Sequence, residues 1–393
     1  MSTEPACRRL VVAAVALVTA VTAMNTAVTA GASDDPLFGD QWSLEQIGAP
    51  AAWAASTGEG VLVGIVDTGV DASHPDLRDK IEAQVTCTGG TCREGSARDG
   101  HGHGTAVAGV IAASTGNGTG IAGVAPGARL IVAKAMDDDG RGGTLDINAA
   151  IAWVVERGAK VVNLSLGDPD LRLTSLIGSP LRSGIEYAWS RGAIPVLASG
   201  NYDDGAAAGA GLSANYGDLN AVVVGATDRN GRVPSYSTSL GNAKWGVVAP
   251  GGSGRAAGAG VLSTARSGRY GWSSGTSLAA PHVSGALALL LAQGLPPSVA
   301  VERLLSTADG SPCGEGCQGR LRADAAVAVA AAGEVVAASP DGSPLAAAGA
   351  PGMDGAGGGG GAGRAPLIGL AAVLVAAAGA STAATAIWSR RRA

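Results

Sequence analysis

Between residues 40 and 333 the chain alternates short, continuous apolar runs with longer stretches in which apolar residues recur every three or four positions. Continuous apolar runs of this length are typical of strands buried on both faces, and the longer period is typical of helices with one buried side. The predicted strands are 61–66, 129–133, 160–166, 193–198 and 221–226. The predicted helices are 106–113, 144–157, 181–191, 277–293 and 298–306. This alternation predicts an α/β fold in which helices cover both faces of a mainly parallel sheet, with polar chemistry at the carboxyl ends of the strands.

Residues 1–32 have the pattern of an export signal. Arg8 and Arg9 precede an apolar run over 10–18, and small residues with the spacing of a cleavage site follow. This order of basic, apolar and small segments is typical of a secretory signal peptide. We expect cleavage to leave a mature chain that begins near Gly31 or Ser33, and an uncleaved membrane anchor is the alternative.

The C-terminal end carries a second membrane signal. Residues 367–388 contain no charged side chain, and a helix of this length crosses a hydrocarbon core about 30 Å thick. The tail 389–393 contains three arginines, so the positive-inside rule predicts that this tail is cytoplasmic and that the preceding chain is extracellular. A soluble Ala-rich helix is the alternative. Residues 334–366 are rich in Gly, Ala and Pro and are predicted to be a flexible linker, which leaves 33–333 as the folded domain.

The composition defines the core and argues against one class of partner. The chain of 393 residues is 46% hydrophobic but only 3% aromatic, so its core must consist mainly of Ala, Val, Ile and Leu. The net charge is −5 and the basic residues are scattered. Because a nucleic-acid site needs a concentrated basic surface, we expect no nucleic-acid partner.

Four cysteines remain after removal of the signal segment, and they form two close pairs. Cys87 and Cys92 flank a Thr-Gly-Gly-Thr turn, and Cys313 and Cys317 flank Gly-Glu-Gly. In an exported protein two local disulfides are the favoured interpretation, although four cysteines allow three connectivities. A zinc site made by all four thiolates is the alternative.

Reactive side chains occur where predicted strands end and predicted helices begin. Asp67 directly follows an all-apolar strand, His103 precedes a helix of small residues, and Asn201 follows the strand 193–198. Ser277 begins an apolar helix, where unpaired N–H groups and the positive end of the helix dipole face any developing negative charge. Taken singly, each residue also fits an ordinary role as a cap or core residue.

Pro281 supports the placement of Ser277 in the first helical turn. A proline lacks the N–H that would bond to the carbonyl four residues earlier, which here is that of Ser277. The helix therefore loses one hydrogen bond in its first turn rather than in its interior.

The Asp, His and Ser residues lie in three motifs: D-T-G at 67–69, H-G-T-A-V-A-G at 103–109 and G-T-S-L-A-A-P-H-V-S-G at 275–285. Together the motifs resemble those of the subtilisin-like serine proteases, the subtilases. The resemblance covers about residues 35–310 and implies the family's three-layer α/β fold. It also implies hydrolysis of peptide bonds through an acyl-enzyme, by an endopeptidase.

Carried over to this chain, the resemblance implies one role for each residue of a catalytic site. Ser277 would be the nucleophile, His103 the general base and Asp67 the carboxylate that fixes the imidazole tautomer. Asn201 would stabilise the oxyanion together with the Ser277 backbone N–H. The other histidines lack the Gly-Thr that follows His103 and are expected in loops (His74, His101) or packed in a helix (His282).

The same resemblance implies how a polypeptide substrate binds. The segments 162–167 and 139–142 are similar to the two strands that flank an extended peptide in the family, and 198–200 to a wall of its main specificity pocket. Arg141 would favour acidic residues in the substrate, and an exposed loop charge without a role in binding is the alternative. The implied substrate-binding residues are Gly140, Gly142, Ser165, Leu166, Gly167, Ala198, Ser199 and Gly200.

Residues 114–123 resemble the calcium loop of thermitase-like subtilases. This resemblance implies a structural Ca²⁺ ion held by hard oxygen ligands. The implied ligands are the carboxylates of Asp35 and Asp76, the amide oxygen of Asn117, and the carbonyl oxygens of Ser114, Thr119 and Ile121. A solvated Gly-rich turn is the alternative, and no metal is expected to take part in catalysis.

The linker and membrane span after the folded domain resemble those of the mycosins, the membrane-anchored subtilases that accompany type VII secretion in actinobacteria. No folding propeptide of ordinary size fits between the export signal and Asp35. The resemblance implies a single-pass cell-membrane protein with its catalytic domain outside and the type VII secretion machinery as a partner. The alternative is a catalytically silent subtilase fold that acts as a scaffold or binding component at the cell surface.

Overall fold

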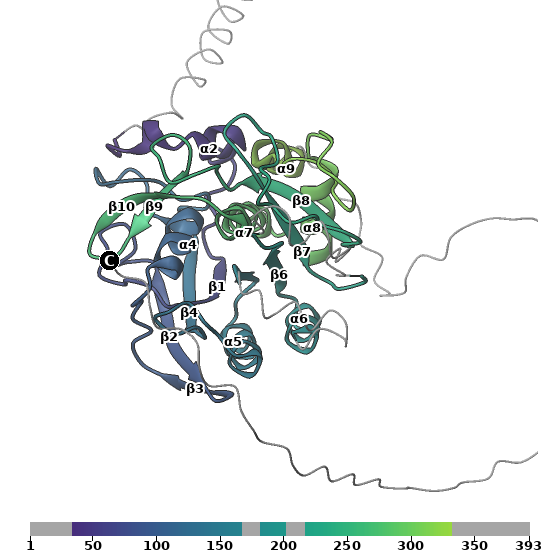
Figure 1. Ribbon diagram of the computed structural model, residues 1–393. Helices are drawn as coiled ribbons and strands as arrows, with labels where there is room; N and C mark the ends of the chain where they lie inside the picture. The colour runs from purple at the N-terminus through teal and green to yellow at the C-terminus, as the bar shows by residue number, and fades with distance from the viewer. Residues whose placement is uncertain (1–33, 167–180, 202–216, 332–393) are drawn as a thin grey trace, which may run out of the picture. The chain divides into compact units, whose positions relative to one another are not determined.

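The computed structural model describes residues 34–166, 181–201 and 217–331 (Figure 1). All of them belong to the first of two compact units, Met1–Val336, and the second unit is Ala337–Ala393. The predicted signal peptide, linker, membrane span and cytoplasmic tail therefore lie outside the described residues, as does Gly167. Among the residues that are described, no helix is long and apolar enough to cross a membrane.

Eight strands form one sheet in the order β3-β2-β4-β1-β5-β6-β7-β8. Neighbouring strands are parallel, except that β2 and β3 form an antiparallel hairpin. The strands are β1 (Leu62–Asp67), β2 (Ile81–Thr88), β3 (Thr91–Glu94), β4 (Arg129–Lys134), β5 (Val161–Leu164), β6 (Ile194–Ala198), β7 (Val222–Thr227) and β8 (Trp245–Pro250). A separate antiparallel hairpin contains β9 (Val261–Ala265) and β10 (Arg269–Ser273).

The helices also match the predicted pattern, with short additions near both ends of the described chain. They are η2 (Phe38–Asp40), α2 (Trp42–Gln46), α3 (Ala49–Ala52), α4 (His103–Ala112), α5 (Thr144–Glu156), α6 (Arg182–Ser190), α7 (Thr276–Ala292), α8 (Pro297–Ser306) and α9 (Ala323–Ala331). The five predicted strands correspond to β1, β4, β5, β6 and β7, and the five predicted helices to α4 through α8.

Helices cover both faces of the sheet, with α4 and α7 on one face and α5 and α6 on the other (Figure 1). The strands supply side chains to both layers because successive residues point to opposite faces. In β1, Val63 and Ile65 belong to the core cluster on the α4 and α7 side, and Val66 belongs to the cluster on the α5 and α6 side. The predicted α/β fold with a mainly parallel sheet between helices is therefore confirmed.

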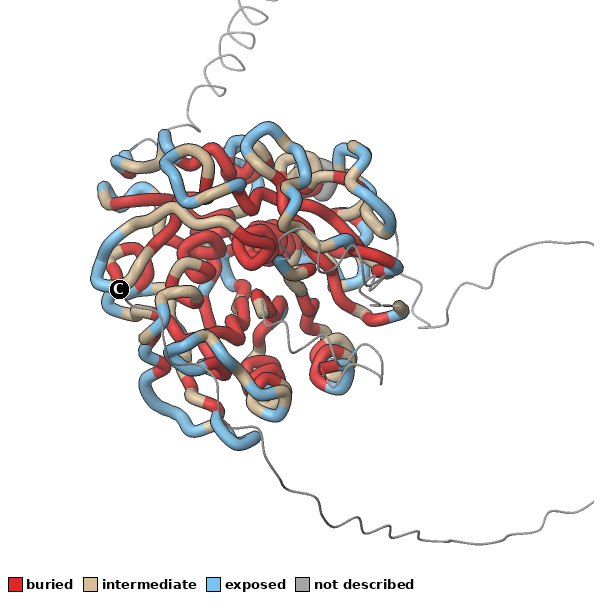
Figure 2. Tube along the Cα trace, in the orientation of Figure 1, coloured by how far each residue is buried: buried red, intermediate tan, exposed pale blue. Residues whose placement is uncertain are grey.

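The helix α7 is buried at every position from 276 to 290, and Figure 2 shows it at the centre of the molecule. It packs against β5, β6, β7 and β8 on one side and against α4, α8 and α9 elsewhere. A helix that is apolar all round can be stable only in such a place. Because α7 runs through the core, its first turn lies at the carboxyl ends of the parallel strands.

Candidate active site

The last residue of the central strand β1 and the first residue of α4 form a hydrogen-bonded pair. Asp67 is fully buried, and its Oδ1 lies 2.7 Å from Nδ1 of His103. Because an ionised carboxylate can only accept, Nδ1 is the donor in this hydrogen bond. The backbone N–H of Thr68 donates to the same oxygen at 2.7 Å. The ring nitrogen Nε2 of His103 is therefore left as the one that can accept a proton.

Competing effects act on the pKa of His103, and the net result is a raised value. Burial acts to lower the pKa of His103, because it disfavours the charged ring. The negative charge of Asp67, its hydrogen bond and the charge of Asp99 outweigh this effect. The side chain is still 22% exposed, so a substrate group can reach it. A raised pKa makes this histidine a stronger base at neutral pH.

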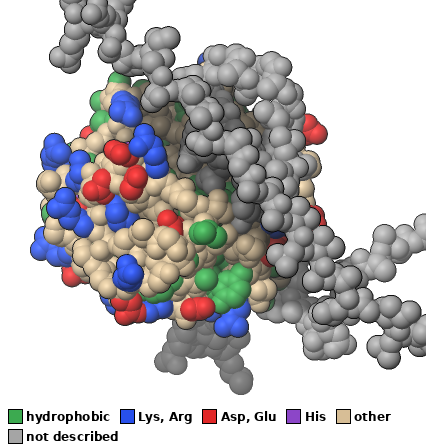
Figure 3. All heavy atoms as spheres, turned by 60° about the horizontal axis from the view of Figure 1, so that its bottom comes forward, with side chains coloured by type: hydrophobic (Ala, Val, Ile, Leu, Met, Phe, Trp, Pro, Cys, Tyr) green, Lys and Arg blue, Asp and Glu red, His purple; other side chains and the backbone are tan. Residues whose placement is uncertain are grey.

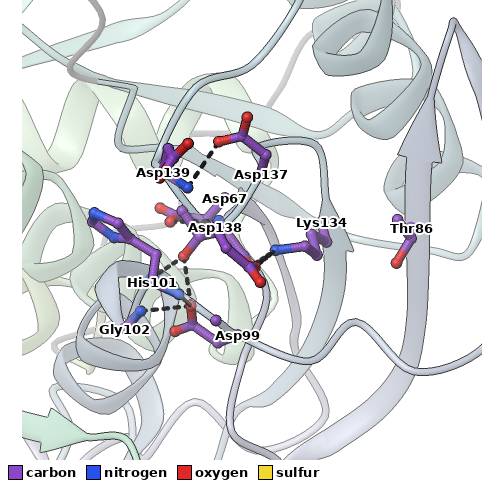
Figure 4. Close-up of polar contacts among 12 residues, drawn as sticks. Asp67, Thr86, Asp99, His101, Gly102, Lys134, Asp137, Asp138 and Asp139 are labelled. Carbon is purple, nitrogen blue, oxygen red and sulfur yellow. Dashed lines mark hydrogen bonds and ion pairs between the residues drawn. The ribbon is translucent and has the colours of Figure 1, made fainter.

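Asp99 organises the loop that leads into α4, a role that sequence reasoning missed. Its carboxylate accepts hydrogen bonds from backbone N–H groups at His101 (3.0 Å), Gly102 (2.6 Å) and Thr105 (2.9 Å), the first two of which are drawn in Figure 4. It also accepts from the hydroxyl of Thr68 at 2.9 Å, which links the loop to the end of β1. The available signal was an Asp in a Gly-rich loop before a helix, the usual position of a cap.

Ser277 and Asn201 meet at Gly275, just before α7. A Cβ added to Gly275 would lie 3.1 Å from Oγ of Ser277 and 3.3 Å from Nδ2 of Asn201. The Asn201 amide is oriented by its oxygen, which accepts from the backbone N–H of Thr276 at 2.8 Å and from its hydroxyl at 3.1 Å. Because the oxygen is bonded to Thr276, the nitrogen is the group of this amide that can donate to an oxyanion.

The loop after β4 contains Gly140 and Gly142 and lies next to His101, just before α4. A Cβ at Gly140 would be 3.3 Å from Nε2 of His101. The turn is held by Asp137, whose carboxylate accepts the backbone N–H groups of Asp139 at 3.0 Å and Arg141 at 2.9 Å (Figure 4 shows the first). Arg141 also forms an exposed ion pair with Asp139 at 3.3 Å, which competes with its predicted attraction for an acidic substrate residue.

The remaining predicted substrate segments follow β5 and β6, which are neighbours in the sheet. Ser165 is fully buried, and its side chain donates to the carbonyl of Ser277 at 2.9 Å, so only its backbone is left for a substrate. Leu166 and Ala198 are partly buried, and Ser199 is 5% exposed. The N–H of Gly200 is bonded to the Thr276 hydroxyl at 3.1 Å, which joins this segment to the start of α7.

The loop 114–121 lies against two buried carboxylates. Asp35 is 3% exposed and Asp76 is fully buried, and neither forms an ion pair within the described part of the chain. Both contact Asn117: its backbone N–H donates to Asp35 at 3.1 Å and its Nδ2 donates to Asp76 at 3.1 Å. Two buried negative charges at one loop fit a bound cation, because an uncompensated buried charge is costly.

One predicted ligand is turned away from this arrangement. The amide oxygen of Asn117 accepts the backbone N–H of Thr119 at 2.8 Å, so its nitrogen faces Asp76. The amide would have to turn over to offer its oxygen beside Asp76. Within the described residues no group of three or more His, Cys, Asp or Glu side chains could hold a metal ion, so carbonyl oxygens such as those of Ser114, Thr119 and Ile121 would have to complete the ligand set.

The four described cysteines form the two predicted local disulfides, Cys87–Cys92 and Cys313–Cys317. The alternative zinc site is therefore excluded, because oxidised cysteines offer no thiolate ligands. His282 lies in α7 as expected and is fully buried, with Nδ1 2.7 Å from the Leu278 carbonyl. His74 lies in a loop but is also fully buried.

The surface carries charges of both signs. Figure 3 shows acidic side chains interspersed with lysines and arginines on the described part of the face that it presents. Several are paired, for example Arg129 with Glu82 at 3.0 Å and Arg182 with Asp218 at 2.7 Å. The absence of a nucleic-acid partner stays a prediction.

Comparisons with known proteins agree with this geometry. The Subtilase family (peptidase S8) matches residues 58–357. Thermitase of Thermoactinomyces vulgaris is 36% identical over 280 residues, which cover 70% of this chain and 91% of thermitase. Subtilisin BL of Lederbergia lenta is 40% identical over 250 residues, which cover 63% of this chain and 83% of the relative.

Among solved structures, a protease from Pseudoalteromonas arctica PAMC 21717 superposes with a TM-score of 0.63 at 34% identity. The match covers 76% of this chain and 99% of that protein. The fold, the paired Asp67 and His103, and the serine at the start of α7 thus coincide with a family match over most of the chain. The chain belongs to the subtilase family and is a subtilisin-like serine peptidase.

Proposed function

We propose that this protein is an endopeptidase that cleaves polypeptides through an acyl-enzyme on Ser277. The observation that carries the proposal is the buried 2.7 Å bond between Asp67 and His103 at the carboxyl end of the central strand. This bond fixes the histidine tautomer, so Nε2 can take the proton of Ser277 as the serine attacks the substrate carbonyl. The protonated ring then donates its proton to the leaving amine, which leaves the acyl-enzyme and a neutral ring. In the second half-reaction this neutral ring accepts a proton from water as the water attacks the acyl-enzyme, and returns the proton to Ser277.

The oxyanion of each tetrahedral intermediate would be stabilised by two donors. The first is Nδ2 of Asn201, whose amide is oriented by its bonds to Thr276. The second is the backbone N–H of Ser277 in the first turn of α7, where the helix dipole adds a positive potential. Loss of one such donor typically lowers kcat by about 10²- to 10³-fold.

A fluorophosphonate probe, which labels an activated serine covalently, tests the proposal. The wild-type protein should be labelled and should cleave peptides, and Ser277→Ala should do neither. Ser253→Ala, which removes an exposed serine hydroxyl, serves as the control and should react like the wild type. Labelling of correctly folded Ser277→Ala would refute the assignment, and an unlabelled wild type would favour the alternative of a catalytically silent scaffold.

We further propose that a structural Ca²⁺ ion binds at Asp35, Asp76 and the loop 114–121. The proposal is supported by two buried carboxylates that share contacts with Asn117 and have no cationic partner among the described residues. The ion would neutralise these charges and supply no step of the hydrolysis. The donor oxygens are of the hard type that calcium requires.

We also propose that export and a C-terminal anchor hold the catalytic domain outside the cell, as in the mycosins of type VII secretion. Support comes from the sequence alone, in the apolar run 367–388 and the arginines that follow it. A chain truncated after residue 364 should appear in the medium as an active enzyme, whereas the full chain should stay with the membrane. Uncut full-length protein found wholly in the medium would contradict the anchor.

A further inference from the structure

The carbonyl of Ser277 lacks the hydrogen bond that an α-helix normally gives it. In a helix this oxygen would accept from the N–H four residues later, which here belongs to Pro281, a residue with no N–H. The position is buried, because Ser277 is only 6% exposed and Pro281 lies among the buried residues of α7. A buried carbonyl without a donor is costly, so another group is needed.

Ser165 supplies the missing donor from the neighbouring sheet. Its hydroxyl, just beyond the end of β5, donates to the Ser277 carbonyl at 2.9 Å. A serine hydroxyl has one proton, so this bond uses the only one that Ser165 has. The hydroxyl oxygen in turn accepts from Nδ2 of Asn163 at 2.9 Å.

The chain of bonds returns to the same helix two turns later. The amide oxygen of Asn163 accepts the hydroxyl of Ser284 at 2.9 Å. Asn163, Ser165 and Ser284 are all fully buried, so water does not compete for these bonds. The donor of each bond is defined: Ser284 donates to Asn163, Asn163 donates to Ser165, and Ser165 donates to Ser277. This buried chain of hydrogen bonds connects α7 to β5 and the residue after it at two points.

We propose that Ser165 is a positioning residue, held in place by Asn163 and Ser284, which fixes the backbone of Ser277 and thereby aims its hydroxyl. The proposal rests on the proposed function, in which Ser277 is the nucleophile. The carbonyl of Ser277 is bonded to Ser165, and the N–H of Thr276 is bonded to Asn201 at 2.8 Å. The backbone is therefore held on both sides of the reactive side chain. Reacting atoms must be about 3–3.5 Å apart, and a misplacement of about 1 Å lowers the rate by up to about 10²-fold.

The test compares Ser165→Ala and Ser284→Ala with a matched control in the same helix. The control is Ser56→Ala, because Ser56 also donates a serine hydroxyl to an α7 carbonyl, that of Leu289 at 2.7 Å, but at the far end of the helix. For each variant three quantities are measured: the second-order rate constant of fluorophosphonate labelling, kcat and KM for a peptide, and the urea midpoint.

We expect Ser165→Ala to lower the labelling rate and kcat by about 10-fold or more, with KM unchanged, because the nucleophile is misaligned while the substrate site is intact. Ser284→Ala should lower both by a smaller, few-fold factor, since Asn163 then holds Ser165 less firmly. The double variant should be no slower than Ser165→Ala, because Ser284 acts only through Ser165. Ser56→Ala should lower the urea midpoint but label at the wild-type rate.

Wild-type labelling by folded Ser165→Ala, or a rise in KM with kcat unchanged, would overturn the proposal. The second result would make Ser165 a substrate-binding residue. If Ser165→Ala does not fold, Ser284→Ala decides alone: a labelling rate equal to that of Ser56→Ala overturns the proposal, and a slower one supports it. Failure of the proposed function is distinguishable, since labelling of Ser277→Ala would show a different nucleophile whatever the Ser165 variants do.

Discussion

The Asp67 carboxylate determines both which nitrogen of His103 is protonated and how strongly the ring binds a proton. In Asp67→Asn the neutral amide can stabilise the wrong tautomer, and we expect turnover to fall by about 10⁴-fold. The lost charge should also lower the pKa of His103, because burial is then less opposed. A general base works when neutral, so the acid limb of the residual pH–rate profile should move to lower pH. An unchanged acid limb would contradict this account of the pKa.

His282 makes the stability of the protein sensitive to acid. Burial lowers the pKa of His282 to about 4, compared with about 6.5 in the unfolded chain. Between these values the unfolded state binds more protons, so the contribution is present above about pH 6.5 and is lost as the pH falls toward 4. The loss amounts to about 3 kcal/mol for a shift of this size.

The measurement is the free energy of unfolding in urea at pH 4.5 and pH 7, with Ser277→Ala in every sample to prevent self-cleavage. His282→Asn keeps a hydrogen-bond donor but cannot titrate in this range. Its stability should therefore fall less between the two pH values than that of the parent. Equal losses in the two proteins would show that His282 does not titrate on unfolding.

At the scale of elements, the two disulfides lie at opposite edges of the sheet. Cys87–Cys92 joins β2 to the edge strand β3. Cys313–Cys317 belongs to a segment that runs along the other edge strand, β8: Gly319 accepts the N–H of Val248 at 3.0 Å, and Gln318 donates to Gly246 at 2.9 Å. An uncovered edge strand can pair with another chain, so this segment protects β8.

Removal of the second disulfide should loosen that protective segment. In Cys313→Ser/Cys317→Ser the unfolded state gains the entropy of a short loop, which costs about 2 kcal/mol of stability. Amide hydrogen exchange should become faster at Val248 and Leu321, whose N–H groups make the bonds along this edge. The control Cys87→Ser/Cys92→Ser should lose similar stability but leave exchange in β8 unchanged. Unaltered exchange at β8 in the first variant would show that the disulfide does not hold the segment.

At the scale of the whole molecule, the first described segment, 34–41, forms an N-terminal arm that is attached to the loop 114–121 through Asp35. Protein bonds already contribute: Leu37 donates to the Gly120 carbonyl at 2.8 Å, and the Gln41 amide bonds both backbone groups of Ala122 at 2.8 Å. These bonds do not neutralise the two buried carboxylates, Asp35 and Asp76. An ion that binds only the folded state would add about 2.7 kcal/mol at roughly 100-fold excess over its Kd.

We therefore expect chelation to lower the melting temperature and to expose the chain near Asp35 to proteolysis before the core unfolds. Fluorophosphonate labelling of freshly chelated protein should persist, because no metal activates Ser277 in the proposed mechanism. The decisive comparison is the parent against Asp76→Ala, each with Ca²⁺ and with chelator, in the Ser277→Ala background. Equal melting temperatures in all four samples would remove Ca²⁺ from this account and leave the loop as an ordinary turn.

The sequence by itself determined the features that depend on neighbours along the chain. The strands β1, β4, β5, β6 and β7 are buried over most of their length, so each is a mainly apolar run that can be recognised without knowledge of its partners. The helices α4 through α8 were predicted from their apolar residues. The Asp motif lies at the end of β1, and the His and Ser motifs lie at the starts of α4 and α7. The start of α4 was predicted at 106 but lies at His103, after an N-cap at Gly102. The carboxylate of Asp99 bonds the N–H groups of Gly102 and Thr105 there, which only the folded loop makes possible.

The tertiary structure decided what depends on residues far apart. The strands β2, β3 and β10 are partly exposed and polar, so their sequences lack the apolar run that predicts a strand. They are extended because each pairs with a neighbouring strand. The orientation of the Asn117 amide is set by Asp76 and Thr119, not by the loop motif. Pro281 predicts from the sequence that the Ser277 carbonyl has no donor within the helix. The group that replaces this donor, the hydroxyl of Ser165, lies 112 positions away. A hydrogen bond across that separation exists only because β5 and α7 pack against each other, and no local pattern encodes it.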